Sequence, residues 1–172
     1  MTRKIGLVSG LAASLLALGA LLAGPAPADT FGTTPVHLTT DFRGGSSCLD
    51  TISDNDHSDF AALRPCGYYS GQFWYATDAG NGAVRLHTRF RGDNICLDTY
   101  NGGVYDNEVH FVGCANYSGQ LWHFASVNGH VSLWNDFRGN GMCLDIVNGG
   151  SHNDRAHLAA CGNYTGQIWH AW

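Results

Sequence analysis

The sequence repeats one set of landmarks three times, and this constrains the fold more than any other feature. Each copy opens on a Val-x-Leu segment that leads into Phe-Arg-Gly: VHLTTDFRG from Val36, VRLHTRFRG from Val84 and VSLWNDFRG from Val131. A Cys-Leu-Asp triplet, a second Cys and a Gln-x-Trp triplet follow in the same order. Every landmark advances by 48 and then by 47 residues. We therefore infer three copies of one unit, covering about residues 36–83, 84–130 and 131–172.

Within each unit the pattern predicts short strands separated by tight turns. The Val-x-Leu segments alternate as half-buried strands do. Asn81-Gly82 and Asn128-Gly129 precede two of these segments and predict hairpin turns. Further turns are predicted at Asn101-Gly102-Gly103 and Asn148-Gly149-Gly150, and between turns no segment is long enough for a regular helix with an apolar stripe. With 23 glycines and only 13% charged residues, the composition also favours a turn-rich, all-β domain over a coiled coil.

Residues 1–28 have the features of a secretory signal peptide. Arg3 and Lys4 precede a long apolar run, and a small-x-small Ala-Pro-Ala motif ends at Ala28. A membrane anchor is the alternative, because the run approaches the roughly 17–20 residues that span a bilayer. No other stretch is apolar enough to do so. We expect cleavage, so that residues 29–172 form the secreted, extracellular protein.

The charge of the expected mature chain excludes two classes of partner. Beyond residue 28 the chain holds seven arginines, no lysine and 14 acidic residues, a formal net charge of −7. Nucleic-acid binding by phosphate neutralisation needs an excess of basic residues, and anionic lipid headgroups repel an acidic surface. We therefore expect no nucleic acid and no membrane among the partners, and a monomeric protein.

The cysteines follow the repeat, with two in each unit. Six cysteines allow 15 pairings, and only three of these respect a threefold repeat. The simplest joins neighbours within a unit: Cys48 with Cys66, Cys96 with Cys114, and Cys143 with Cys161. Each such disulfide closes a loop of about 18 residues and contributes roughly 3 kcal/mol in the chain-entropy model.

Metal binding is the alternative use of the cysteines and of the nine histidines. Structural zinc sites place two cysteines within two to four residues of each other, and no pair here is that close. The histidines do not recur at ligand spacing either, and His152 with His157 is the nearest approach. We expect disulfides, which suit an oxidising compartment, and no metal or other cofactor.

Three units of about 47 residues with Cys-Leu-Asp, a second Cys and Gln-x-Trp resemble the ricin B-type lectins, a family that includes the xylan-binding modules of carbohydrate-binding module 13. The resemblance covers about residues 34–172. It implies a β-trefoil, in which six of twelve strands form a short barrel and six cap one end. It also implies that Trp74, Trp122 and Trp169 pack in the core, and we expect Phe42, Phe90 and Phe137 to join them.

The resemblance further implies up to three shallow sugar sites, one in each repeat. In the family, the Asp after the first Cys accepts hydrogen bonds from two sugar hydroxyls. A polar side chain four residues before the second Cys assists, and an aromatic residue two before it stacks on the sugar. An Asn directly before the Gln of Gln-x-Trp completes the site. Such a site suits a neutral sugar, which offers both hydroxyl groups and an apolar C–H face.

Carried over position by position, the family pattern is only partly present. The Asp is Asp50, Asp98 and Asp145, and the polar position is Ala62, His110 and His157. The stacking position is Arg64, Val112 and Ala159, none of them aromatic, and the Asn position is Gly71, Gly119 and Gly166. These departures place a galactose-type site of the usual design in question, most of all in the first repeat.

A tyrosine in each Gln-x-Trp turn offers a compensation. It is Tyr68 or Tyr69 in the first repeat, then Tyr117 and Tyr164, and it is either a stacking residue or a packing residue. The Asp likewise has two interpretations, as a ligand for sugar or as a cap for the turn that follows. The candidate sugar-binding residues are Asp50, Asp98, His110, Tyr117, Gln120, Asp145, His157, Tyr164 and Gln167.

These observations predict a secreted lectin module without catalytic activity that binds neutral, galactose- or xylose-type sugars. Glycosidases need two carboxyl groups about 5–9.5 Å apart, whereas the recurring Asp occurs once per repeat. The three units also leave no residues for a separate catalytic domain. A protein-binding trefoil, such as an inhibitor or a toxin-associated subunit with degenerate sugar pockets, is the alternative.

Overall fold

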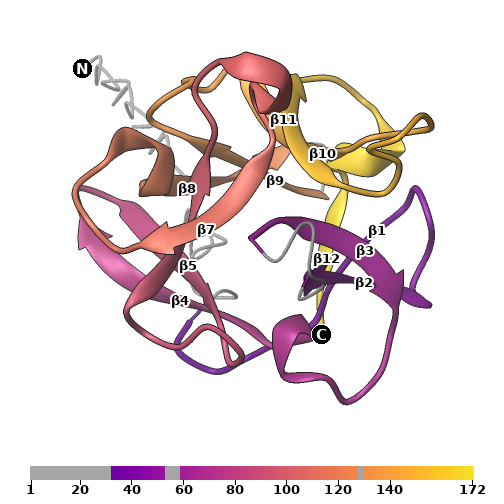
Figure 1. Cartoon of the computed structure of the whole chain (residues 1–172), viewed down its shortest axis with the longest axis horizontal. Coiled ribbons are helices and arrows are strands. Elements are labelled where there is room, and N and C mark those ends of the chain that lie inside the picture. The colour runs from indigo at the N-terminus through magenta and orange to yellow at the C-terminus, as the bar shows by residue number, and fades with distance from the viewer. Residues whose placement is uncertain (1–31, 53–58, 128–129) are drawn as a thin grey trace, which may run out of the picture.

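The computed structural model describes residues 32–52, 59–127 and 130–172, which form short strands and turns wrapped around a common centre (Figure 1). The first repeat holds β1 (Leu38–Thr40), β2 (Ser47–Thr51), β3 (Ala61–Pro65) and β4 (Trp74–Gly80). The second holds β5 (Ala83–Thr88), β6 (Ile95–Thr99), β7 (Val109–Gly113) and β8 (Trp122–Val127). The third holds β9 (His130–Asn135), β10 (Met142–Ile146), β11 (Ala156–Ala160) and β12 (Trp169–Ala171).

Helical structure among the described residues is confined to 3-10 turns of three residues each. They are η2 (Ser70–Gln72), η3 (Gly103–Tyr105), η4 (Ser118–Gln120) and η5 (Thr165–Gln167). No helix in these ranges has the length and apolar character needed to cross a bilayer. The predicted leader at 1–28 and the predicted turn at Asn128-Gly129 lie outside the described residues.

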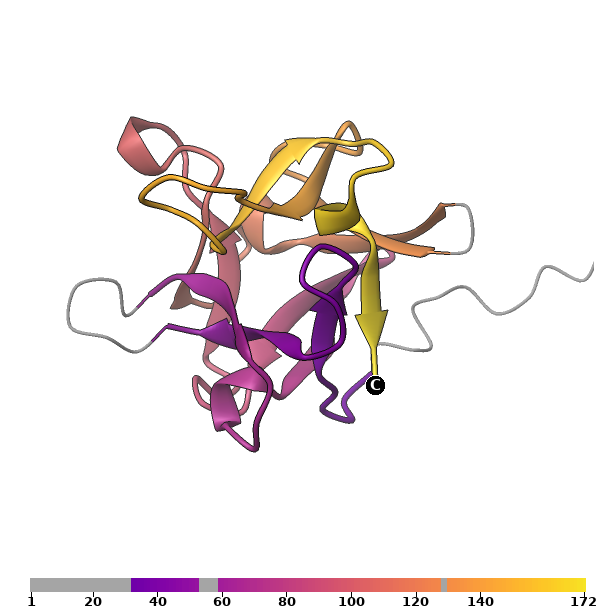
Figure 2. The same ribbon diagram turned by 90° about the vertical axis from the view of Figure 1, so that its right-hand side faces the viewer.

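Six strands form a closed barrel. The hairpins β4–β5 and β8–β9 join successive repeats, and β12 lies antiparallel to β1 (Figure 2). A Val–Trp bridge completes the ring within each repeat: Val36 with Trp74, Val84 with Trp122, and Val131 with Trp169. The remaining strands pair as the hairpins β2–β3, β6–β7 and β10–β11. This is the expected β-trefoil.

The core is built on the three tryptophans of Gln-x-Trp. Trp74, Trp122 and Trp169 are at most 2% exposed, as predicted. Each indole Nε1 donates to the backbone carbonyl of the Leu in Cys-Leu-Asp, at 2.7, 2.9 and 2.9 Å in the three repeats. Each tryptophan therefore fixes the strand that carries the Asp of its own repeat.

The prediction for the phenylalanines of Phe-Arg-Gly is wrong in one repeat and only partly right in the others. Phe90 is 49% exposed, whereas Phe42 is partly buried against the core and Phe137 is partly buried. All three follow the end of a barrel strand and lie in the turn beyond it, so their rings reach only the rim of the barrel. The arginine that follows Phe42 and Phe137 stacks on the ring, at 4.2 and 4.3 Å from its centre.

The predicted disulfide pairing is confirmed. Cys48–Cys66, Cys96–Cys114 and Cys143–Cys161 each join a strand to the turn that follows its hairpin partner, with Cα atoms 4.9–5.0 Å apart. Three disulfides indicate that the protein folds in an oxidising environment. The Asn81-Gly82 turn is also confirmed, since both residues take the positive φ angles, 56° and 78°, that a tight hairpin turn requires.

The three capping hairpins meet on the pseudo-threefold axis through unlike side chains. Phe60, Glu108 and Arg155 occupy equivalent positions in the three repeats, and all are buried. Arg155 Nη1 lies 3.1 Å from Glu108 Oε2, and its guanidinium carbon lies 4.5 Å from the centre of the Phe60 ring. His152 Nδ1 also contacts the Glu108 carboxylate. The axis is therefore closed by a mixed ionic and aromatic cluster.

Candidate functional site

One hydrogen-bonded arrangement, here named the Asp–Gln brace, occurs in every repeat. In the first repeat it links Asp50 on β2 to Gln72 in η2. The Gln72 amide nitrogen donates to Asp50 Oδ2 and to the Pro65 carbonyl, both at 3.0 Å, while its oxygen accepts from the Gly67 N–H at 2.8 Å. Gln72 is fully buried. Because both amide N–H groups and the carbonyl oxygen have partners, Gln72 holds the Asp50 carboxylate in one position.

The other repeats build the same brace. Gln120 donates to Asp98 Oδ2 at 3.0 Å, and Gln167 donates to Asp145 Oδ2 at 2.9 Å. Each glutamine also donates to a backbone carbonyl and accepts from a backbone N–H at 2.7–3.1 Å. Gln120 and Gln167, both predicted to contact sugar, are at most 1% exposed. Their geometry makes them positioning residues for the neighbouring carboxylate.

A glycine beside each brace explains the missing Asn of the family pattern. A Cβ at Gly71, Gly119 or Gly166 would lie 2.2, 2.0 or 2.1 Å from Oδ1 of the aspartate in its own repeat. Real Cβ atoms do not approach an oxygen so closely, so any larger residue would displace the carboxylate. The Asp conformation and the glycine are therefore coupled, and together they differ from the Asp–Asn pair implied by the resemblance.

The three carboxylates differ in their access to solvent. Asp98 is only 8% exposed, while Asp50 and Asp145 are half-buried. The next backbone N–H, of Thr99 or Ile146, donates to Oδ1 of Asp98 or Asp145 at 2.7 Å. Burial raises the pKa of the Asp50 carboxyl, although the hydrogen bond from Gln72 opposes this shift. Each carboxylate keeps free lone pairs after these bonds, because an ionised carboxylate offers about four.

The tyrosine of each turn is presented to solvent at the same position. Tyr69, Tyr117 and Tyr164 are 63%, 61% and 60% exposed. The ring of Tyr69 lies against Gly67, where a Cβ would be 2.4 Å from Cε2, and Tyr164 lies against Gly162 in the same way, at 2.6 Å. Part of each ring thus packs on the glycine backbone, and the rest is exposed to solvent. The packing interpretation describes part of this arrangement, and stacking on a sugar stays a prediction.

His110 and His157 lie directly across the hairpin from the aspartate of their repeat. The strand register pairs Asp98 with His110 and Asp145 with His157, whereas Asp50 faces Ala62. Burial lowers the pKa of both histidines, and the nearby aspartate opposes this shift. His110 also stacks on Tyr100, with ring centres 3.7 Å apart. A histidine thus lies across from the carboxylate in the second and third repeats, whereas the first repeat has the buried Ala62 there.

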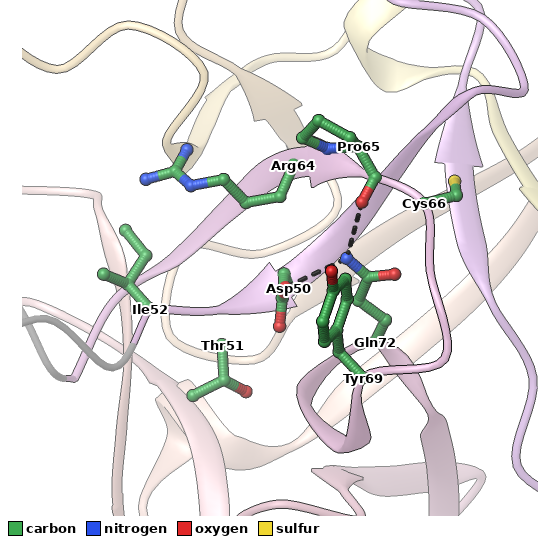
Figure 3. Close-up of a pocket in the computed structure, with 8 residues that line it drawn as sticks. All are labelled: Asp50, Thr51, Ile52, Arg64, Pro65, Cys66, Tyr69 and Gln72. Carbon is green, nitrogen blue, oxygen red and sulfur yellow. Dashed lines mark hydrogen bonds between the residues drawn. The ribbon is translucent and has the colours of Figure 1, made fainter.

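Asp50 lines a cavity in the first repeat. The cavity has a volume of about 420 Å³, and Figure 3 shows Asp50 between Tyr69 on one side and Arg64 with Ile52 on the other. A second hollow of about 350 Å³ shares Asp50 and Tyr69 and is bounded by Tyr68 and Phe90. The two hollows form a continuous surface around Tyr69 with one carboxylate, one guanidinium and several aromatic rings.

Comparison with known proteins agrees with this architecture. Residues 36–169 match the family model described as the ricin-type beta-trefoil lectin domain. The chain belongs to this family. No curated protein matches it in sequence.

Solved structures similar to this lectin domain share its fold at low sequence identity. The designed threefold-symmetric protein ThreeFoil matches at 18% identity with a TM-score of 0.62, covering 80% of this chain and 96% of its own. A ricin B-like lectin of Macrolepiota procera in complex with lactose matches at 14% identity and 0.62, covering 81% and 95%. The C-terminal half of an earthworm R-type lectin, in complex with GalNAc, matches at 14% and 0.54, covering 80% and 97%.

The structure of this lectin domain thus groups the candidate residues differently from the sequence. It joins Asp98 to Gln120 and His110, and Asp145 to Gln167 and His157, with Tyr117 and Tyr164 in the adjacent turns. In the first repeat it brings Tyr68 and Tyr69, which the sequence offered as a compensation, beside Asp50, and it adds Arg64 and Phe90. Arg64 stands at the stacking position of the family pattern and Phe90 was expected in the core, so the sequence suggested neither as a site residue.

Proposed function

We propose that this lectin domain binds neutral sugars without catalysis, and that its principal site is the cavity at Asp50. The observation that carries the proposal is the Asp50 carboxylate, held by Gln72 at the wall of an open cavity beside the exposed ring of Tyr69. A carboxylate fixed in advance accepts hydroxyl hydrogen bonds with little further loss of entropy.

Each wall of the cavity has a defined part in this proposal. Asp50 accepts hydrogen bonds from two neighbouring hydroxyls, and the ring of Tyr69 packs on the apolar C–H face of the sugar. The exposed Arg64 donates to a ring or hydroxyl oxygen from the opposite side. The second hollow, beside Tyr68 and Phe90, accommodates a further sugar unit of an oligosaccharide.

The second and third repeats supply weaker sites of the same kind. A sugar has less room beside the carboxylate in these repeats. The sites consist of Asp98 with His110 and Tyr117, and of Asp145 with His157 and Tyr164. Gln120 and Gln167 position these aspartates. Several shallow sites on one protein bind a polymeric glycan with avidity that exceeds any single affinity.

Galactose-type sugars are the first ligands to test, because similar structures contain lactose and GalNAc, and xylose-type sugars are the second. Catalysis is not proposed, since the residues that line the Asp50 cavity include a single carboxylate, whereas glycosidases need two. The three disulfides support secretion, with residues 1–28 as a cleaved leader.

A glycan array with the mature protein and three variants tests the proposal. Asp50→Ala, Tyr69→Ala and Arg64→Ala should each lower binding at least about tenfold, a loss of about 1.4 kcal/mol. Asp98→Ala combined with Asp145→Ala should have a smaller effect. Tyr69 and Arg64 are exposed, so their variants remain informative if Asp50→Ala fails to fold. Wild-type binding by folded Tyr69→Ala and Arg64→Ala proteins would contradict the assignment, as would release of reducing sugar from the glycans.

A further inference from the structure

A second kind of site lies between the repeats, away from the Asp–Gln braces. At three equivalent places, a pair of barrel strands passes beside a disulfide. The pairs are β12–β1 with Cys48–Cys66, β4–β5 with Cys96–Cys114, and β8–β9 with Cys143–Cys161. We call these places the first, second and third inter-repeat clefts. The residues that line the three clefts, and the contacts they make, differ.

The first inter-repeat cleft is filled by the chain's own aromatic side chains. His37 is buried there, with its ring centre 4.7 Å from that of Trp172 and 4.6 Å from that of Phe73. Its Nδ1 lies 3.3 Å from Cys48 Sγ, in the disulfide.

The second inter-repeat cleft is bridged by Arg85, which is equivalent to His37. Arg85 Nη2 donates to Asn116 Oδ1 at 2.6 Å, and the guanidinium also contacts the Ala115 carbonyl at 3.3 Å. On the other side, the Tyr75 hydroxyl donates to Asp93 at 2.5 Å. The polar groups of this cleft are thus paired with one another, and a hollow of about 360 Å³ remains.

The third inter-repeat cleft is open. Ser132 stands where the second cleft has Arg85, and the cavity has a volume of about 520 Å³. Its described lining contains no charged residue. Asn140 and Asn163 occupy the positions of Asp93 and Asn116, and within the described ranges their side-chain amides make no hydrogen bond.

Trp134 lines this cleft and is held in a fixed orientation. His123 stacks on the indole with ring centres 4.1 Å apart and an angle of 16° between the planes. His123 is itself oriented by Asp136, whose Oδ1 lies 2.7 Å from its Nε2. An indole fixed in this way loses little conformational freedom when a ligand packs on it.

We propose that the third inter-repeat cleft binds a neutral pyranose ring. Trp134 packs on the apolar C–H face of the sugar, and the amides of Asn140 and Asn163 exchange hydrogen bonds with its hydroxyls. An uncharged lining favours an uncharged ligand, because a charged one would lose its hydration without gaining a partner. None of the lining residues is shared with the Asp50 cavity, so the proposal stands independently of the function proposed above.

The test is an NMR titration with methyl β-D-galactopyranoside and, separately, with methyl β-D-xylopyranoside. The indole N–H resonance of Trp134 and the amides of Gly162 and Asn163 report on the cleft. A single sugar ring of this size is expected to bind with a Kd on the order of millimolar. At least one of the two sugars should shift all three resonances with a common Kd.

Two variants take their residues from the second repeat. Ser132→Arg introduces the bridging guanidinium, and Trp134→His removes the indole. Each should weaken binding at least tenfold, measured on Gly162 and Asn163. Tyr69→Ala is the matched control, because it changes the Asp50 cavity only and should leave the Trp134 shifts unchanged.

The outcomes separate the two sites. Unchanged resonances at Trp134, Gly162 and Asn163 with both sugars at saturation would overturn the proposal. Binding retained by both folded variants, Ser132→Arg and Trp134→His, would overturn it too. In the wild-type protein, sugar-induced shifts at Trp134, Gly162 and Asn163 with no shift at the amide of Asp50 would support this site while contradicting the function proposed for the Asp50 cavity.

Discussion

The Asp–Gln braces and the pseudo-threefold axis use the repeat in opposite ways. At the braces, the same residue types make the same hydrogen bonds in all three repeats, with Gln-to-Asp distances of 2.9–3.0 Å. At the axis, the equivalent positions are occupied by Phe60, Glu108 and Arg155, which share no chemistry. One region keeps the symmetry and the other breaks it.

The difference follows from which residues are in contact. A brace closes within its own repeat, so three copies do not interfere with one another. The axis brings three equivalent side chains together, and three buried glutamates or three buried arginines would repel one another. The inter-repeat clefts support the same rule, because there too neighbouring repeats meet and the residues differ. Symmetry is retained at the braces, where contacts are internal, and lost at the axis cluster and the inter-repeat clefts, although the shared core keeps the same Trp and Leu residues in every repeat.

Breaking the ion pair at the axis should have the largest effect on stability. Glu108→Ala leaves the buried Arg155 guanidinium without its carboxylate, and we expect a loss of about 3–5 kcal/mol in the free energy of unfolding. Urea denaturation with the disulfides intact measures this loss. The matched control replaces both charges, Glu108→Leu with Arg155→Leu, and should recover most of it. A loss below about 1 kcal/mol for Glu108→Ala would show that the pair is not structural.

Removing one brace should cost less, and the same amount in each repeat. Gln72→Ala, Gln120→Ala and Gln167→Ala each remove the amide donor of an aspartate Oδ2 and the partner of two backbone groups, for an expected loss of about 2–3 kcal/mol. The three losses should agree within about 0.5 kcal/mol, which urea denaturation can resolve. If one of the three variants kept the wild-type free energy of unfolding, the braces would not be equivalent, and the inferred symmetry would be contradicted.

Adding a methyl group beside a brace should have a smaller effect. Gly119→Ala places a Cβ 2.0 Å from Asp98 Oδ1, so the carboxylate must move, at an expected cost of about 1–3 kcal/mol. Gly113→Ala is the control, because a Cβ there meets nothing within 4 Å. Asp98→Ala in the Gly119→Ala background should remove the clash. Equal thermal stability of the two glycine variants would contradict the coupling of Asp98 and Gly119.

The smallest expected effect is a dependence of stability on pH through His110 and His157. Burial lowers the pKa of both in the folded protein, so below about pH 6.5 the unfolded chain binds protons that the folded chain does not. Stability contributed by these neutral histidines is present above about pH 6.5 and is lost as the pH falls toward their folded pKa. The decrease in Tm on acidification should be smaller for His110→Gln with His157→Gln than for wild type. An identical decrease would contradict the prediction.

The repeat predicts three β-rich units and the disulfide partners, because both depend on contacts within one repeat. The β-trefoil topology and the core position of the tryptophans came only from the resemblance to the ricin B-type lectins. Phe90 was placed wrongly because it lies in a turn beyond a strand end, where periodicity carries no information on burial. The Phe60, Glu108 and Arg155 cluster was not foreseen either, since sequence spacing does not show which positions meet on the axis.

The candidate site was predicted in part. The aspartates were identified from the resemblance, but their access to solvent depends on tertiary packing, since Asp145 facing His157 is half-buried like Asp50 facing Ala62, whereas Asp98 is buried. The glycines at 71, 119 and 166 were interpreted as lost asparagines, whereas the structure shows each directly beneath a carboxylate oxygen. Such close approaches depend on the tertiary structure.

A crystal structure of the protein with lactose tests whether Asp50 and Tyr69 bind a neutral sugar. We expect lactose in the cavity beside Arg64, with two hydroxyls donating to Asp50 and one sugar face on Tyr69. A structure at saturating lactose in which this cavity holds only solvent would contradict this expectation.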